Sequence, residues 1–132
     1  MKKNSVFDCS IIELPKINNR AGNITPVTNN VSIPFDIKRI FYIYGVDNSV
    51  RGGHRHHKTI QAAICIQGSC LIHCDNGIDK SDFELNVPNK CLILNPEDWH
   101  AMSRFSPDAI LMVLASEFFE KEDYIFEPYK TK

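Results

Sequence analysis

Apolar runs rich in β-branched and aromatic residues alternate with polar turns along most of the chain. These runs recur every eight to twelve residues, a spacing typical of an all-β sandwich or barrel rather than a βαβ fold. The pattern therefore predicts an all-β domain. The expected strands lie at residues 9–14, 24–28, 37–44, 54–57, 61–67, 69–74, 83–87, 91–95, 99–105 and 109–115.

Turns and one helix complete the predicted elements. Asn76-Gly77 predicts a hairpin with a type I′ turn, because both residue types accept positive φ angles. Residues 116–124 predict a short C-terminal helix, with Ser116 as N-cap and acidic residues in its first turn. We interpret Glu117 to Asp123 as the solvated face of that helix.

Within the expected strand 37–44, alternation places Ile40, Tyr42 and Tyr44 on one face and Arg39, Phe41 and Ile43 on the other. Both tyrosines suit a core as well as a site. If their face is the interior, their hydroxyls need partners there.

Length and charge limit the classes of function. The 132 residues fit one domain, 1–132, with 43% hydrophobic residues and a net charge of −1. The chain has neither a basic block for nucleic acid or an anionic membrane nor an apolar run long enough for a signal peptide or a membrane span. Five cysteines, an odd number, suggest free buried thiols in a reducing cytoplasm. A zinc site at Cys70, His73 and Cys74 is the rival interpretation, but these residues lack C-x-x-C spacing.

Two histidines carry the strongest chemical signal. His54 and His56 share one face of a strand, four residues separate His56 from Gln61, and six separate Gln61 from Gly68. This resembles the first motif of cupin barrels, H-x-H-x(4)-E-x(6)-G, with glutamine in place of the metal-binding glutamate. The segment 96–100, Pro-Glu-Asp-Trp-His, resembles the second cupin motif. Because a neutral amide is a weak ligand for a divalent metal, we expect a site without metal or other cofactor, whose histidines titrate near neutral pH. The alternative is that His54 and His56 belong to the charged end of an ordinary strand and have no chemical role.

The chain as a whole resembles the sugar-nucleotide 3,4-ketoisomerases, the WxcM-like ketoisomerase family. The similarity runs from about residue 10 to 129, and its most specific blocks are Arg51-Gly52-Gly53-His54-Arg55-His56 and Phe105-Ser106-Pro107-Asp108-Ala109. It implies a small cupin (jelly-roll) β-barrel and a homodimer that exchanges N-terminal strands. It also implies that a dTDP-4-keto-6-deoxyhexose is converted to its 3-keto isomer without metal.

The resemblance and the chemistry together give candidate residues. We expect His56 to act as the base, with His54 as its partner, Tyr42 to bind the enediolate, and Arg51 to anchor an oxygen or the diphosphate. No chemistry is assigned to His57 or His73. Substrate-binding residues are expected to be Tyr44, Gln61, Trp99, His100, Met102 and Asn23.

Three other functions stay open at this point: a metal-dependent cupin oxygenase, a dTDP-sugar 3,5-epimerase and a non-catalytic cupin that binds sugar nucleotides. The sequence also departs from the ketoisomerase pattern. It reads His-Arg-His-His-Lys where the family has His-Ala-His-Lys, and Arg20-Ala21-Gly22 where the family often has Asp-Arg-Gly. The second departure affects a turn that is expected to border the sugar.

Overall fold

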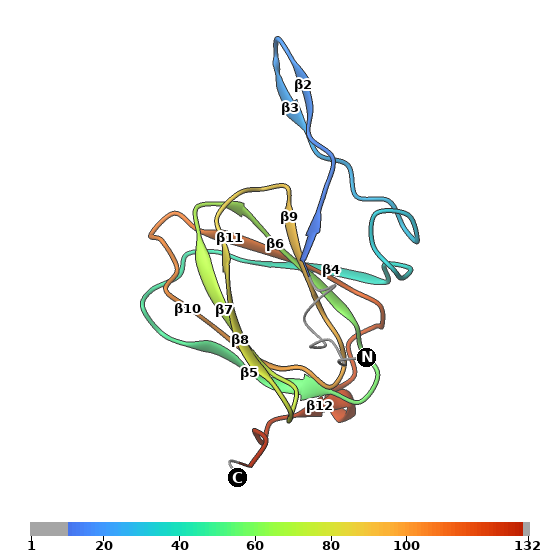
Figure 1. Cartoon of the computed structure of the whole chain (residues 1–132), viewed down its shortest axis with the longest axis vertical. Helices are drawn as coiled ribbons and strands as arrows, with labels where there is room; N and C mark the ends of the chain where they lie inside the picture. Colours follow the sequence, from blue (N-terminus) through green and yellow to red (C-terminus); the bar gives the residue numbers. More distant parts are fainter. Residues whose placement is uncertain (1–10, 131–132) are drawn as a thin grey trace, which may run out of the picture.

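Two five-stranded antiparallel sheets face each other in the computed structural model, which describes residues 11–130 (Figure 1). The first sheet has the order β1 (Ile11–Glu13), β9 (Lys90–Leu94), β6 (Gln61–Gln67), β11 (Ile110–Ala115) and β4 (Arg39–Ile43). The second has the order β12 (Tyr124–Ile125), β5 (Arg51–His56), β10 (Trp99–Ser103), β7 (Cys70–Asp75) and β8 (Lys80–Leu85). This jelly-roll arrangement confirms the predicted cupin fold.

The main core fills the space between the two sheets, and a second apolar layer covers the outside of the first sheet. Ala63, Cys65, Leu111 and Val113 belong to the inner core. Residues 27–37 cross the outer face of the first sheet. There their apolar side chains pack on the side chains of this sheet that point away from the main core. β6 is therefore buried on both faces from residue 61 to 65, which explains why its sequence is continuously apolar after Gln61 instead of alternating.

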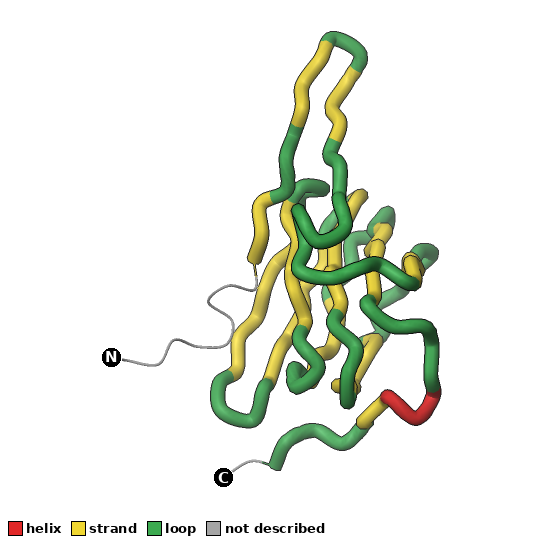
Figure 2. Tube along the Cα trace, turned by 90° about the vertical axis from the view of Figure 1, so that its right-hand side faces the viewer, coloured by secondary structure: helices red, strands yellow, loops and turns green. Residues whose placement is uncertain are grey.

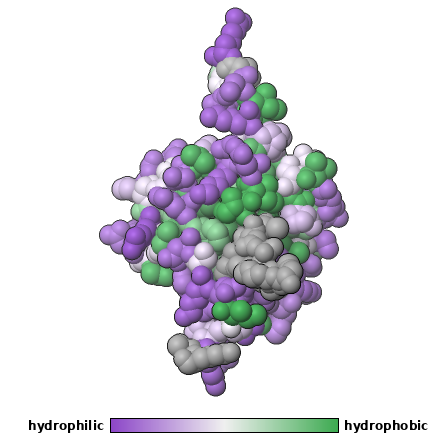
Figure 3. All heavy atoms as spheres, viewed as in Figure 1, coloured by the Kyte–Doolittle hydropathy of each residue, from purple (hydrophilic) through white to green (hydrophobic). Residues whose placement is uncertain are grey.

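A two-stranded arm extends from the barrel. It consists of β2 (Ile17–Asn19) and β3 (Gly22–Ile24), which pair with each other and join neither large sheet (Figures 1 and 2). The space-filling view shows apolar side chains gathered on the barrel face below the base of this arm (Figure 3). The predicted strand at 24–28 is wrong, because Ile24 ends β3 and the following residues are not in a strand.

The hairpin between β7 and β8 is confirmed, but its turn is not type I′. The connection covers residues 76–79, and Gly77 has φ +91° whereas Asn76 has no positive φ. Instead, the Asn76 side-chain oxygen accepts hydrogen bonds from the backbone N–H groups of Ile78 and Asp79, both at 2.7 Å. The asparagine thus closes a four-residue loop with its side chain.

The predicted helix over residues 116–124 is wrong except for one 3₁₀ turn at Lys121–Asp123. Ser116 does not cap it: its hydroxyl accepts a hydrogen bond from the backbone N–H of Ile60 at 2.9 Å, and its own N–H donates to the Ile60 carbonyl. This pairing keeps the chain extended where the helix was expected to begin. The segment then runs past the end of β5 and adds β12 to that strand.

Two expectations concern the chain's environment. The four described cysteines, Cys65, Cys70, Cys74 and Cys91, are free and buried; Cys9 lies outside the described residues, as does the start of the first predicted strand. Among residues 11–130 we find no helix with the length and apolar character needed to cross a membrane.

Gly68 gives a test of the fold. Its φ is +73°, and a Cβ there would lie 2.9 Å from the Cα of Ala109 and against the side chains of Ser106 and Asp108. We expect Gly68→Ala to lower the free energy of unfolding by about 2 kcal/mol or more, because backbone strain and a clash add. Gly45→Ala is the matched control, since Gly45 has φ +63° but no atom within 4 Å of the place where the added methyl group would lie. Urea unfolding would contradict the prediction if both variants lost the same stability.

Candidate active site

Two neighbouring strands of the second sheet bring three histidines together. His54 and His56 lie on one face of β5, and His100 lies on β10, where it pairs in register with His54. The ring centroid of His54 lies 5.0 Å from that of His56 and 4.8 Å from that of His100. The strand alternation read from the sequence therefore places the first two imidazoles as expected, and the β5–β10 pairing supplies the third.

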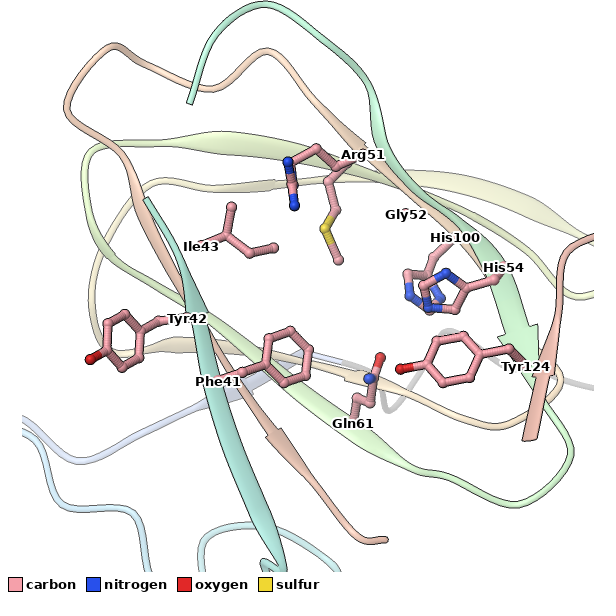
Figure 4. Close-up of a pocket in the computed structure, with 10 residues that line it drawn as sticks. Phe41, Tyr42, Ile43, Arg51, Gly52, His54, Gln61, His100 and Tyr124 are labelled. Atoms are coloured by element: carbon pink, nitrogen blue, oxygen red, sulfur yellow. The ribbon is translucent and has the colours of Figure 1, made fainter. Parts of the chain in front are cut away.

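Two histidines of the cluster, His54 and His100, line a cavity of about 310 Å³ between the two sheets, and His56 contacts His54 without being a lining residue itself. The cavity wall includes Arg51, His54, Gln61, His100, Met102 and Tyr124 (Figure 4). Phe41 and Ile43 close it from the side of β4. The volume is at the lower end of the range for small-molecule sites, which suits a sugar ring better than a whole nucleotide sugar.

A buried carboxylate holds His56. Asp123 is 5% exposed, and its Oδ2 lies 3.0 Å from His56 Nδ1. The same oxygen accepts a hydrogen bond from the Thr59 hydroxyl, and Oδ1 accepts from the backbone N–H groups of His57 and Lys58 at 3.2 and 2.8 Å. Because an ionised carboxylate only accepts, Nδ1 of His56 carries the proton and Nε2 keeps its lone pair.

His100 is oriented in a similar way by a backbone group. Its Nδ1 lies 3.0 Å from the carbonyl oxygen of Asp98, so Nδ1 donates and Nε2 is the free acceptor. Nε2 of His56 and Nε2 of His100 are both buried and have no hydrogen-bond partner among the described residues. Two buried imidazole nitrogens without partners indicate that a ligand completes this cluster.

Burial keeps the cluster neutral. Burial, reinforced by the neighbouring imidazoles, lowers the pKa of His54 to about 4 and the pKa of His100 to about 3. Burial also lowers the pKa of His56, although the charge of Asp123 and its hydrogen bond act in the opposite direction. Burial alone would raise the pKa of Asp123, but hydrogen bonds from Thr59 and the Lys58 amide and the interaction with His56 together lower it. At neutral pH the site thus contains neutral bases and an anionic Asp123.

Gln61 occupies the position where the cupin motif usually has glutamate. It is 2% exposed, lines the cavity, and its Oε1 has no partner among the described residues. Across residues 11–130, no group of three or more His, Cys, Asp or Glu side chains is arranged so that it could hold a metal ion. The polar groups that face the cavity are therefore imidazoles, a neutral amide, the phenol of Tyr124 and the guanidinium of Arg51.

Four residues expected at the site do not direct their side chains into the cavity. Tyr42 and Tyr44 are 61% and 69% exposed, and the Tyr42 ring points away from the cavity on the outer side of β4 (Figure 4). Trp99 lies on the opposite face of β10 from His100, and its indole N–H donates to the carbonyl of Phe126 at 3.1 Å. Asn23 is exposed on the arm. The described chain brings together His54, His56, Arg51, Gln61, His100 and Met102. Tyr42 borders the same cavity from β4 although its ring points away from it, and Tyr44, Trp99 and Asn23 are not among the lining residues.

Sequence reasoning missed Asp123 and Tyr124. Both lie in the predicted helix 116–124, and Asp123 was interpreted as part of its solvated face; instead Asp123 is buried and Tyr124 pairs with His56 as the first residue of β12. A signal was present: Tyr124-Ile125-Phe126 is a run of residues with high β-propensity directly after an acidic residue.

Comparison with known proteins identifies the family. A family model described as "FdtA: WxcM-like, C-terminal" matches residues 7–131. The chain belongs to this family. It is 37% identical over 116 residues to the TDP-4-oxo-6-deoxy-alpha-D-glucose-3,4-oxoisomerase of Aneurinibacillus thermoaerophilus, a match that covers 87% of this chain and 84% of the relative. The resemblance inferred from the sequence is thus confirmed.

Solved structures of a similar ketoisomerase support the fold. QdtA from Thermoanaerobacterium thermosaccharolyticum, a sugar 3,4-ketoisomerase solved in complex with TDP, has a TM-score of 0.89 and 36% identity, with 93% of this chain and 90% of QdtA covered. A histidine-to-asparagine variant of QdtA has been solved with TDP-4-keto-6-deoxyglucose; it has a TM-score of 0.86 and 37% identity, with 89% and 86% covered.

The buried imidazoles make stability depend on pH. Unfolded His100 takes up a proton below its ordinary pKa of 6.5, whereas folded His100 stays neutral down to about pH 3. Stability from this residue is therefore lost as the pH falls below 6.5, by at most about 2 kcal/mol between pH 6.5 and 5. Asp98 acts in the opposite direction, because burial raises its pKa to about 6.

A His100 variant separates the contribution of His100 to the pH dependence of stability from the contribution of Asp98. We expect His100→Asn to lose less stability than the wild type between pH 7 and 5, measured by urea unfolding. His57→Asn, at an exposed position of the same chain, serves as the control and should follow the wild type. An identical pH dependence in the wild type and His100→Asn would show that His100 is not buried as a neutral base.

Proposed function

We propose that this FdtA-family chain is a sugar-nucleotide 3,4-ketoisomerase, which moves the keto group of a dTDP-4-keto-6-deoxyhexose from C4 to C3. The observation that carries the proposal is His56, with Nδ1 held by the buried Asp123 and Nε2 free within a cluster of neutral imidazoles. The named activities of the Aneurinibacillus relative and of QdtA give the substrate class.

The reaction needs proton transfer without any net change in composition. A base removes the proton from C3, and the electron pair forms a C3–C4 double bond while the C4 oxygen takes up the charge. The resulting enediol then gains a proton at C4 and loses one from the C3 oxygen, which leaves the ketone at C3. The enzyme must therefore hold a neutral base near carbon and hydrogen-bond donors near both oxygens.

The residues suit these roles. His56 is the base, because Asp123 fixes its tautomer and stabilises the imidazolium that forms when it accepts a proton. His54 lines the cavity and moves protons between the substrate oxygens. Arg51 is exposed at the start of β5 and also lines the cavity, so its guanidinium can bind a substrate oxygen or the diphosphate from the mouth. Gln61, His100 and Met102 form the wall against the sugar.

We further propose that two copies of the chain form a homodimer by exchanging their N-terminal strands. Ile17 and Ile24 pair across the arm and are 52% and 53% exposed. The outer face of β4 exposes Ile40 and Tyr42, and Tyr44, directly after this strand, is also exposed. An arm received from a second copy would cover apolar surface of this kind, and Asn23 would then contact the partner's substrate rather than its own. The buried free thiols agree with a reducing cytoplasm as the place of action.

Isomerisation in heavy water tests the function directly. With dTDP-4-keto-6-deoxyglucose, the wild type should release the C3 hydrogen to solvent and form a 3-keto product with deuterium at C4, followed by NMR. His56→Asn should lower kcat by about 10³-fold, within the range for loss of a general base, and leave dTDP binding nearly unchanged. His73→Asn is the control, because His73 lies on β7 and its Nδ1 is 2.6 Å from Asp82, away from the cavity.

The same experiment separates the alternatives. Deuterium at C3 and C5 would identify a 3,5-epimerase, and consumption of oxygen that depends on added metal would identify an oxygenase. Binding without deuterium at any ring carbon would identify a non-catalytic cupin. Wild-type rates in His56→Asn, with activity lost only in His54→Asn, would assign the base to His54 instead.

The arm gives a separate prediction about assembly. The wild type should have twice the mass of one chain by light scattering, and Ile17→Ser combined with Ile24→Ser should shift the protein toward the monomer, because the substitutions remove apolar contact area. Ile78→Ser is the control: Ile78 is 82% exposed but lies in the loop between β7 and β8. A monomeric wild type at micromolar concentration would contradict strand exchange.

A further inference from the structure

Tyr124 enters the cavity beside the histidines. It is the first residue of β12, pairs in register with His56, and directly follows Asp123. Its ring centroid lies 4.7 Å from the ring centroids of both His54 and His56. Backbone pairing on one side and the Asp123 hydrogen bonds on the other therefore fix this ring against the two imidazoles.

The hydroxyl of Tyr124 points into the cavity. In Figure 4 it lies on the side of the ring that faces Gln61, while the ring itself comes in from the strand next to His54. Within residues 11–130 this hydroxyl makes no hydrogen bond to the protein, and the Gln61 Oε1 also lacks a partner. The hydroxyl is open to the cavity, so a ligand bound there can be its partner, whereas Gln61 Oε1 is buried.

Packing accounts for the ring of Tyr124 but not for its hydroxyl. The ring also contacts Phe119 and Phe126, with centroids 5.7 and 6.0 Å away. A phenylalanine would make the same contacts. The other three of the chain's four tyrosines are placed differently: Tyr42 and Tyr44 are exposed, and Tyr129 donates to the carbonyl of Glu97 at 2.8 Å.

We propose that Tyr124 is a catalytic residue, whose hydroxyl donates a hydrogen bond to the C4 oxygen as negative charge develops there. This inference rests on the proposed isomerase function. As His56 takes the C3 proton, the C3–C4 double bond forms, the C4 carbonyl π bond breaks, and Tyr124 stabilises the C4 oxyanion. His54 then passes the proton of the C3 hydroxyl to the C4 oxygen. The C3 carbonyl forms as His56, whose proton has exchanged with solvent, gives a proton to C4, so every group ends in its starting form and no further reactant is needed.

This role replaces the one expected for Tyr42. The chemistry needs a neutral hydrogen-bond donor beside the base, at the oxygen where negative charge develops. Tyr124 meets this geometry within the chain's own cavity, whereas the Tyr42 ring lies on the outer side of β4. A neutral donor of this kind also avoids placing a cation among imidazoles that burial already keeps uncharged.

Tyr124→Phe tests the inference. Because it removes one oxygen that the protein does not bind, the variant should fold with an unchanged melting temperature and bind dTDP as the wild type does. Its kcat should fall by about 10²–10³-fold, as expected for loss of a donor to a developing oxyanion, with KM nearly unchanged.

Tyr129→Phe is the matched control, because it also removes a phenol oxygen near the C-terminus and should keep wild-type rates. Activity of Tyr124→Phe within threefold of the wild type would overturn the inference, as would loss of activity in Tyr42→Phe instead. If the wild type itself neither isomerises the keto-sugar nor exchanges its C3 hydrogen, the proposed function fails, which is a different result.

Discussion

The site depends on one carboxylate that binds four donors. Asp123 accepts hydrogen bonds from the His56 ring, the Thr59 hydroxyl and the backbone N–H groups of residues 57 and 58. These donors form the end of β5 and the turn after it, so Asp123 joins the C-terminal segment to the strand that carries the histidines. Burying an anion is costly without such partners, and their removal would leave several buried donors unsatisfied. The same interaction therefore folds the segment, sets the tautomer of a base and places the next residue, Tyr124, in the cavity.

Neutrality of the imidazoles follows from where the strands put them. Three rings within about 6 Å of one another cannot all be protonated in a partly dry cavity, and burial lowers the pKa of each. Gln61 fits this arrangement, because a glutamate at this buried position would attract a proton or a cation to the cluster. Asp123 contributes its charge from behind His56 rather than from inside the cavity. Because the negative charge lies behind His56 and the cavity side is neutral, His56 is uncharged before the reaction and is stabilised once it has taken up a proton.

The sequence predicted the features that depend on alternation along a strand, and it missed those that depend on contacts between segments far apart in the chain. Alternation correctly placed His54 and His56 on one face, and the β-rich spacing predicted the strands of both large sheets to within a few residues, apart from β12. Alternation also divided strand 37–44 into two sets but could not decide which set faces inward; the core took Phe41 and Ile43, so Tyr42 and Tyr44 face out. Residues 116–124 have a local preference for a helix, but the pairing of Ser116 with Ile60 and of Tyr124 with His56 keeps the two ends of this segment extended. Asp123 escaped notice because its donors are 64 to 67 residues away in the chain.

Trp99 acquires a structural explanation once the C-terminal segment is seen as part of the site. Its indole N–H binds the carbonyl of Phe126, two residues after Tyr124. The segment is thus tied to β5 and β10 on both sides of Tyr124, by Asp123 before it and by the Trp99 contact after it. A hydrogen-bond donor to a substrate oxygen, the role proposed for Tyr124, needs such support, because a displacement of about 1 Å costs much of its effect. Trp99 therefore has a structural role on the outer face of β10, where it holds the C-terminal segment in place.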